Sequence, residues 1–312
     1  MVFTVVKALR PVRQRAAPAA FKAAAGSSGV GPRQSQAPSL LKGATSAHVL
    51  NLGASMVGFA PIERWAQHGE VPEAYRPQSI WPLSKTVIVF AVPMLLPVLE
   101  STPSINYQEM YDTSNRLLDD IGYRLATWLC GQGHASIFLP RDGYGSLEAL
   151  LENQFGSFSH TYAAKYAGLG TVGMSRNLIV PEWGPRVRFG SVLTAAELPG
   201  DEERTRELCN GCGVCERLCP AGAIRAREDN LIGDLDKDAC TRHHIELKKE
   251  TRWPCGICAK VCPVGEDRHL FDSRNTRTYL EERAVLQRDR TDPRYRGWVH
   301  LRTHGSRGTR IA

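Results

Sequence analysis

The clearest hydrophobic stretch of the chain is Thr86–Val92, where β-branched and apolar residues follow one another without a charged residue. Such a run predicts a strand that is covered on both faces and ends at Pro93. A long helix is predicted over Tyr107–Cys130, because its apolar positions recur with the spacing of one helical face. Gly131 and Gly133 then end this helix.

Shorter apolar runs predict further elements around these two. They are a helix over Leu41–Leu52 that ends at Gly53, and strands over Ser55–Ala60, Ala135–Leu139 and Arg186–Thr194. The alternation of strands and helices predicts an α/β (α+β) domain, which we place at residues 41–200.

Composition adds little to this picture, but charge is distributed unevenly. Of the 312 residues 42% are hydrophobic, which is ordinary for a globular protein, and the formal net charge is +7. Residues 1–62 contain seven Lys and Arg and no acidic residue, whereas residues 273–312 contain ten Arg and four acidic residues. We expect a disordered or targeting leader over residues 1–40 and a basic tail over residues 273–312. No run of 18 apolar residues occurs, so no membrane span is predicted.

Eight of the nine cysteines lie between residues 209 and 262. They form Cys209-x2-Cys212-x2-Cys215-x3-Cys219-Pro, a single Cys240, and Cys255-x2-Cys258-x3-Cys262-Pro. Thiolates are soft ligands that suit iron–sulfur clusters, and the first run has the bacterial ferredoxin spacing. Residues 201–272 are therefore predicted to form a small bacterial ferredoxin-like domain with two [4Fe-4S] clusters.

In the ferredoxin pattern the fourth cysteine of a run ligates the other cluster. This rule divides the eight cysteines into a first set of Cys209, Cys212, Cys215 and Cys262, and a second set of Cys219, Cys240, Cys255 and Cys258. The second run lacks its leading cysteine, and we expect Cys240 to replace it. Two structural zinc sites are the alternative, because Cys-x2-Cys pairs also bind zinc. The ninth cysteine, Cys130, is expected to be a buried, inert thiol on the long helix.

Residues 141–200 are rich in glycine and contain the spacing G-x-G-x-x-G at Gly168, Gly170 and Gly173. This motif follows the segment Tyr162–Ala167, which is predicted to be helical, whereas a dinucleotide-binding motif follows a strand. We therefore interpret the glycines as positions where the backbone closely approaches another segment or a flat cofactor. Arg176 and Asn177 lie just downstream and complete the predicted cofactor-binding set.

Three side chains near the glycine block are candidates for proton supply. His160 and Tyr162 can both donate a proton to a reduced substrate, and Glu152 lies a few residues upstream. The alternative for His160 and Tyr162 is a hydrogen-bonded pair in the core. Arg176, Arg186 and Arg188 either face solvent or bind a phosphate or carboxylate.

The segment Ala167–Gly173, with Asn177–Ile179, Gly190–Thr194 and the cysteine array, resembles the epoxyqueuosine reductases and the related corrinoid-dependent reductive dehalogenases. The similarity covers roughly residues 40–271. It implies a nitroreductase-like N-terminal domain that holds a cobalamin without a histidine ligand, followed by the cluster domain. It also implies that a reduced ferredoxin or flavodoxin sends electrons through both clusters to cobalt, which removes an oxygen or a halide from the substrate.

The chain departs from this family pattern in two respects. An aspartate that precedes the glycine block in the queuosine enzymes, and is thought to give the proton there, has no counterpart between Gly143 and Gly200. Glu152, His160 and Tyr162 occupy that neighbourhood instead. The helical-repeat extension that grips tRNA in the larger queuosine enzymes has no match in this sequence either.

We therefore predict a cytoplasmic iron–sulfur reductase that passes electrons to a corrinoid and acts on a small-molecule or nucleoside-like substrate. The alternative is a ferredoxin-type electron-transfer protein that has no substrate and docks to a partner enzyme, which the absent aspartate favours. A third hypothesis keeps tRNA as a partner of the basic tail, where Tyr279, Tyr295 and Trp298 lie between arginines. Against it, Trp298 could simply anchor the tail to the body.

Overall fold

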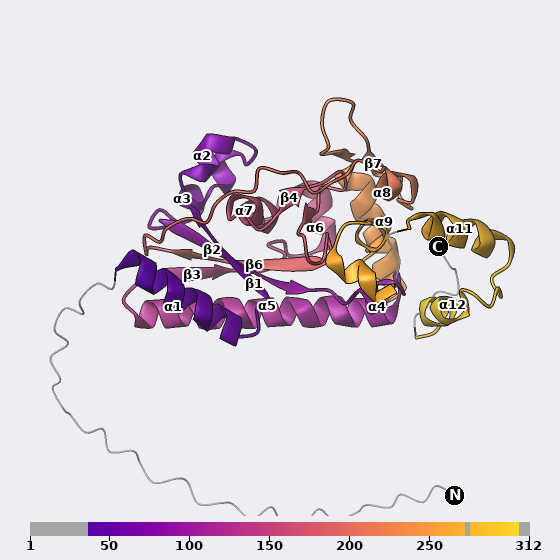
Figure 1. The fold of residues 1–312 in the computed structure, drawn as a ribbon, viewed down its shortest axis with the longest axis horizontal. Coiled ribbons are helices and arrows are strands. Elements are labelled where there is room, and N and C mark those ends of the chain that lie inside the picture. The colour runs from indigo at the N-terminus through magenta and orange to yellow at the C-terminus, as the bar shows by residue number, and fades with distance from the viewer. Residues whose placement is uncertain (1–36, 272–274, 306–312) are drawn as a thin grey trace, which may run out of the picture. The chain divides into compact units, whose positions relative to one another are not determined.

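The computed structural model describes residues 37–271 and 275–305, which belong to one compact unit (Figure 1). The predicted leader over residues 1–40 lies outside the described residues except for its last four. The elements up to residue 200 are α1 (Pro38–Asn51), β1 (Met56–Pro61), α2 (Arg64–His68), η1 (Glu73–Tyr75), α3 (Pro77–Ile80), β2 (Thr86–Pro93), α4 (Leu96–Leu99), α5 (Ile105–Gly131), β3 (Ser136–Leu139), α6 (Leu147–Glu152), α7 (His160–Tyr166), β4 (Thr171–Val172), β5 (Leu178–Ile179) and β6 (Val187–Thr194). Beyond residue 200 follow α8 (Val214–Arg217), β7 (Ile224–Arg225), β8 (Asp234–Leu235), α9 (Lys237–Lys249), α10 (Ile257–Lys260), η2 (Glu266–Phe271), α11 (Arg277–Arg288) and α12 (Arg296–Thr303).

A four-stranded sheet in the order β1-β2-β6-β3 forms the centre of the first part. Every pairing in this sheet is antiparallel, and each of its strands was predicted from the sequence to within a residue or two. Figure 1 shows α1 and α5 on one side of the sheet and α7 on the other. The domain is therefore a mixed helix–strand layer of the α+β kind, with an antiparallel sheet whose faces are both covered.

The strand β2 supplies side chains to two separate cores, because successive residues of a strand point to opposite faces. Val87, Val89 and Ala91 pack with α7 and Trp65 on one face. On the other face Ile88, Phe90 and Val92 pack with α1 and with the apolar stripe of α5. This double burial explains why β2 has no polar alternation.

The exposed position of Cys130 contradicts the expectation of a buried thiol. The buried stripe of α5 runs through Ile121, Leu125 and Leu129. A step of one residue turns the helix by about 100°, so Cys130 leaves the stripe and reaches the surface. Its thiol lies 3.7 Å from the carbonyl oxygen of Ser136.

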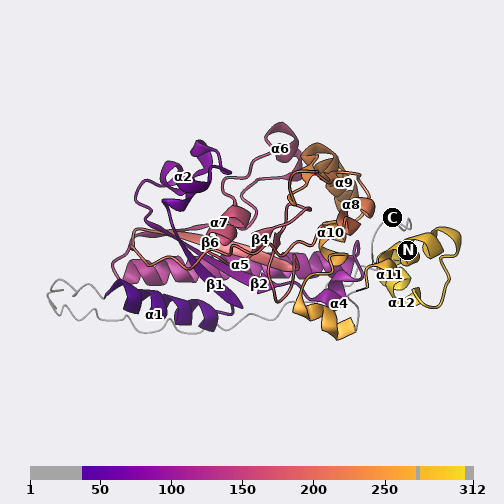
Figure 2. The same cartoon turned by 45° about the horizontal axis from the view of Figure 1, so that its top comes forward.

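Two short helices present the two cysteine runs in the same local conformation. The helix α8 begins after Cys212-Gly213 and α10 begins after Cys255-Gly256, and both glycines are left-handed, with φ of 69° and 67°. Glycine adopts this conformation at little cost, so each Cys-Gly-x-Cys unit turns in the same way. The two helices contact one another (Figure 2).

A buried arginine attaches the second cysteine run to the sheet. Arg186 precedes β6, is fully buried, and donates from two nitrogens to the carboxylate of Asp267 at 2.6 Å each. Its remaining hydrogens reach the carbonyl oxygens of Cys262 at 3.0 Å and Val264 at 2.6 Å. Arg186 therefore does not face solvent. It does bind a carboxylate bidentately, as the second interpretation allows, but this carboxylate is the chain's own Asp267.

The described part of the basic C-terminal segment forms the two helices α11 and α12. Tyr279 of α11 is buried with Val214, Leu218 and Val261 of the cysteine-bearing part. Tyr295 is also buried, and Trp298 is partly buried. Two of the three aromatic residues between the arginines therefore pack inside the protein.

The single glycine of β6, Gly190, makes room for the Phe90 ring. Gly190 pairs with Phe90 across the sheet, and a Cβ at Gly190 would lie 2.5 Å from a ring carbon of Phe90. We expect Gly190→Ala to lower the free energy of unfolding by about 1–3 kcal/mol in urea denaturation, through overpacking.

The matched control for this prediction is Gly43→Ala in α1, where an added Cβ meets no atom within 4 Å. There we expect stabilisation by about 0.5–1 kcal/mol, because alanine favours the helix. Equal effects of the two substitutions would contradict the packing argument.

Candidate functional site

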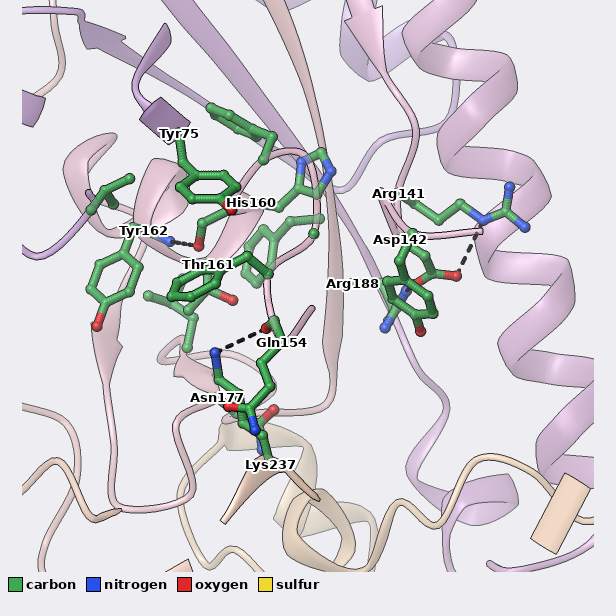
Figure 3. Close-up of a pocket in the computed structure, with 18 of the residues that line it drawn as sticks. Tyr75, Arg141, Asp142, Gln154, His160, Thr161, Tyr162, Asn177, Arg188 and Lys237 are labelled. Carbon is green, nitrogen blue, oxygen red and sulfur yellow. Dashed lines mark hydrogen bonds and ion pairs between the residues drawn. The ribbon is translucent and has the colours of Figure 1, made fainter. Parts of the chain in front are cut away.

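The main candidate site is a cavity of about 420 Å³ beside the sheet, which we call the aromatic cavity (Figure 3). It is formed by η1, the loop that follows β3, the loop between α6 and α7, α7 itself and β6. Its aromatic lining residues are Tyr75, Tyr111, Tyr144, Phe155, Phe158, His160, Tyr162 and Phe189. An aromatic wall of this kind suits a flat, largely apolar group.

A second cavity of about 240 Å³ connects this site with the cysteine-bearing part of the chain. It is lined by Cys219, Cys240, Cys255 and Cys258. Both cavities are lined by Tyr111, Asn177 and Arg188, together with Pro185 and Val187. The second set of cysteines therefore lies next to the aromatic cavity.

The first set of cysteines surrounds a smaller cavity of its own. Its lining includes Cys209, Cys212, Cys215 and Cys262, and also Cys258, which lines the second cavity as well. The structure thus gathers the same two groups of four that the crossing rule gives, while the role of these thiols as ligands stays a prediction. Burial and the nearby thiols of Cys258 and Cys219 raise the pKa of Cys240 to about 12, so a metal would have to displace its proton.

The arrangement of the thiols gives the zinc alternative no support. Tetrahedral Zn–S bonds of about 2.3 Å would bring four sulfurs to within about 4 Å of one another. Among the described residues, no group of three His, Cys, Asp or Glu side chains is arranged to hold a single metal ion. A four-iron cluster is larger than one ion and accepts more widely separated thiolates.

The glycines of the G-x-G-x-x-G motif approach the chain's own backbone. A Cβ at Gly168 would lie 2.0 Å from the carbonyl oxygen of Glu202, and one at Gly170 would lie 2.1 Å from that of Ile179. A Cβ at Gly173 would meet the Ile179 side chain at 2.4 Å. All three glycines therefore lie against other segments of the chain and not against an open cavity.

The two polar residues after the motif lie in different surroundings. Arg176 donates from Nε to the carbonyl oxygen of Gly233 at 2.8 Å and lines neither of the two cavities. Asn177 lines both, and its side-chain amide donates to Ser175 Oγ at 3.1 Å and to Cys258 Sγ at 3.4 Å. Asn177 is thus the member of the predicted cofactor set that links the aromatic cavity to a cysteine.

Of the three predicted catalytic residues, two reach the aromatic cavity. His160 and Tyr162 line it, whereas Glu152 is exposed at the end of α6 and is not among the lining residues. The ring nitrogens of His160 lie 2.9 Å from Ser191 Oγ and 3.0 Å from the Pro140 carbonyl oxygen. In Figure 3, Tyr162 lies on the opposite side of the cavity from Asp142 and Arg188.

A charged network on that far wall was not predicted from the sequence as a unit. Arg188 donates to Asp142 Oδ1 at 2.7 Å and to Asn115 Oδ1 at 2.9 Å, and its guanidinium stacks on the Tyr111 ring at 4.2 Å. The Tyr111 hydroxyl donates to the same oxygen of Asp142 at 3.2 Å. Asp142 directly precedes the stretch from Gly143 to Gly200, which contains no aspartate.

Among the described residues, no helix is long and apolar enough to cross a membrane.

Comparisons with known proteins agree with this geometry. A family model described as "4Fe-4S dicluster domain" matches residues 208–266. The tetrachloroethene reductive dehalogenase of Desulfitobacterium hafniense is 28% identical over 151 residues, which are 47% of this chain and 25% of that protein. The epoxyqueuosine reductase of Synechococcus sp. (strain RCC307) is 44% identical over 61 residues, which are 20% of this chain and 19% of that protein. The matched regions therefore span a quarter or less of these curated relatives.

The fold has a counterpart among solved structures. A catabolic reductive dehalogenase in complex with 3-bromo-4-hydroxybenzoic acid matches 84% of this chain and 38% of its own, with a TM-score of 0.59 and 21% sequence identity. At this identity the likeness concerns the fold. The chain is thus a relative of the reductive dehalogenases and the epoxyqueuosine reductases, and it carries a 4Fe-4S dicluster domain at residues 208–266.

Proposed function

We propose that this chain is an iron–sulfur reductase that passes electrons through two [4Fe-4S] clusters to a corrinoid in the aromatic cavity. The observation that supports this most directly is the shared wall of the two cavities. Tyr111, Asn177 and Arg188 line the aromatic cavity and also the cavity of the second cysteine set. An electron-transfer protein without a substrate would leave a cavity of about 420 Å³ beside its cysteines unexplained.

Under this proposal each set of four cysteines holds one cluster, and residues 41–200 form a nitroreductase-like domain that holds the corrinoid. A bound corrinoid would supply a cobalt centre that accepts electrons and reduces the substrate. His160 is the one histidine among the described residues that line the aromatic cavity, and both of its ring nitrogens are engaged. This supports a corrinoid that is bound without a histidine ligand.

We further propose that the Arg188 network supplies or positions the proton that the reduction consumes. Burial raises the pKa of Tyr111 to about 12, so its hydroxyl keeps its proton at neutral pH. The Tyr111 hydroxyl donates to the Asp142 carboxylate. Arg188 and Asn115 hold this carboxylate in place with hydrogen bonds of their own. Tyr111 therefore joins Tyr162 as a candidate donor. The exposed Glu152 loses support, as does His160, because both of its ring nitrogens are engaged.

The substrate belongs to the proposal only as a class. A small molecule with an aromatic or halogenated body fits the aromatic walls, and a solved relative holds a brominated hydroxybenzoic acid. The tRNA hypothesis has less support, because several arginines of the C-terminal segment have protein partners, among them Arg294 with Glu281 and Arg302 with Glu282. A ferredoxin or flavodoxin as electron donor, and a cytoplasmic location where thiols stay reduced, complete the proposal.

The first test is the binding of cobalamin to the anaerobically reconstituted protein. We expect about eight irons per chain, and we expect the electron paramagnetic resonance signal of added cob(II)alamin to lose its nitrogen splitting when it binds. Turnover assays would then begin with organohalides and epoxyqueuosine. A protein with eight irons and an unchanged cobalamin spectrum would overturn the corrinoid proposal and favour the ferredoxin-type alternative.

A second prediction concerns the ligand sets. Cys255→Ser removes a buried thiol of the second set, so we expect the iron content to fall from about eight to about four per chain. Cys130→Ser is the matched control, because Cys130 is exposed on α5 and should leave all eight irons in place. A Cys255→Ser protein that retains eight irons would disprove the proposed second set.

A third prediction follows from the titration of His160. Burial lowers its pKa from 6.5 to about 4, so the folded state holds the ring neutral while the unfolded state binds a proton below pH 6.5. The stability that His160 contributes is therefore fully present above pH 6.5 and is lost as the pH falls towards 4. We expect the melting temperature to drop less between pH 7.5 and 5.5 in His160→Gln than in the unsubstituted protein.

The control is His300→Gln on the surface of α12, which should keep the pH profile of the unsubstituted protein. The clusters are equally sensitive to acid in all three proteins. A difference between their pH profiles of melting temperature therefore reports the contribution of the His160 imidazole. Parallel pH profiles for His160→Gln and His300→Gln would show that His160 is not held neutral by the fold.

A further inference from the structure

The arginines of the C-terminal segment fall into two groups with different surroundings. Arg294 is exposed and pairs with Glu281 and Asp292 at the surface. Arg302 of α12 is 6% exposed and points into the protein, where Nη2 donates to the carbonyl oxygen of Glu100 at 2.9 Å. The basic character of this segment is therefore only partly a surface property.

Arg302 belongs to a buried cluster of five charged side chains, each 6% exposed or less. They come from five elements or their ends and comprise Glu100, Lys260, Arg268, Glu282 and Arg302. Arg302 contacts Glu282 at 2.5 Å, and Lys260 contacts the other oxygen of Glu282 at 3.2 Å. Arg268 and Lys260 share Glu100 at 3.3 and 3.9 Å. Three cations thus face two carboxylates, which leaves one excess positive charge.

An excess charge in the interior is costly unless something else compensates for it. The Nε of Arg302 is buried and has no hydrogen-bond partner among the described atoms. Arg302, Lys260 and Glu282 line a cavity of about 320 Å³, and Cys255 of the second set lines the same cavity. We therefore look for the negative charge that would balance this network on the side of the cavity that Cys255 lines.

A four-iron cluster with four thiolate ligands supplies such a charge. It is an anion, and it becomes more negative when it takes up an electron. A nearby fixed cation stabilises the reduced form more than the oxidised form, and net surrounding charge is one of the factors that set cluster potentials. The guanidinium of arginine stays charged at every accessible pH, so its contribution does not titrate away.

We propose that Arg302 and its buried network raise the reduction potential of the cluster that Cys255 would hold, which makes α11 and α12 part of the redox unit. This use of the basic segment differs from the binding of RNA. The proposal rests on the dicluster domain alone. It holds or fails whether or not a corrinoid binds in the aromatic cavity.

The test is an anaerobic redox titration of the full chain with both clusters reconstituted, followed by electron paramagnetic resonance. We expect Arg302→Gln to lower one of the two midpoint potentials, with about a tenfold loss of reduced cluster at a fixed potential, which corresponds to about 59 mV for one electron. Arg302→Lys retains the charge and should keep the midpoint near its original value.

A substitution of opposite sign separates charge from packing damage. Glu282→Gln removes one carboxylate from the same network and should raise the midpoint that Arg302→Gln lowers. Arg294→Gln is the matched surface control and should leave both midpoints unchanged.

Three outcomes would overturn the proposal. They are shifts of the same direction in Arg302→Gln and Glu282→Gln, equal shifts in Arg302→Gln and Arg302→Lys, or no shift in any of them. Iron analysis accompanies every titration. If Arg302→Gln fails to hold eight irons, the direction of the Glu282→Gln shift decides, and an unchanged or lowered midpoint there counts against the proposal.

Discussion

The contact between Arg186 and the second cysteine run holds the two parts of the molecule in register. One buried guanidinium binds Asp267 through two nitrogens and also reaches the carbonyl oxygens of Cys262 and Val264. Breaking a buried pair of this kind costs several kcal/mol, because the remaining charge is left without a partner. The attachment point is the first residue before β6, so the central sheet itself carries the cysteines to their position.

The same strand end also shapes the candidate site. Arg188 lies two residues after Arg186, within β6, and takes part in the wall that the two cavities share. One short segment therefore fixes the cysteine run through one arginine and the Asp142 and Tyr111 pair through the other. Any shift of β6 would move the cysteines and the aromatic cavity together.

Several buried, charged side chains lie around the cysteine runs. Arg186, Arg268, Lys260 and Arg302 are each at most 6% exposed, and they are paired with fewer buried carboxylates than cations. Burial of this many cations is unusual for a structural purpose alone, because ion pairs are costly to desolvate. Anionic clusters held by the two cysteine sets would give the arrangement an electrostatic reason.

The sequence by itself determined the local features of this protein. An uninterrupted apolar run placed β2, a helical period placed α5 and a shorter apolar run placed β6. The cysteine spacing divided eight thiols into two groups of four, each of which lines a cavity. Only the tertiary structure decided which polar residues meet. It buried Arg186, sent Cys130 and Glu152 to the surface, and joined Asp142 to Arg188 across 46 residues. Spacing reports contacts within a helix or a turn, whereas long-range pairs depend on how the strands are ordered in the sheet, and no local pattern records that order.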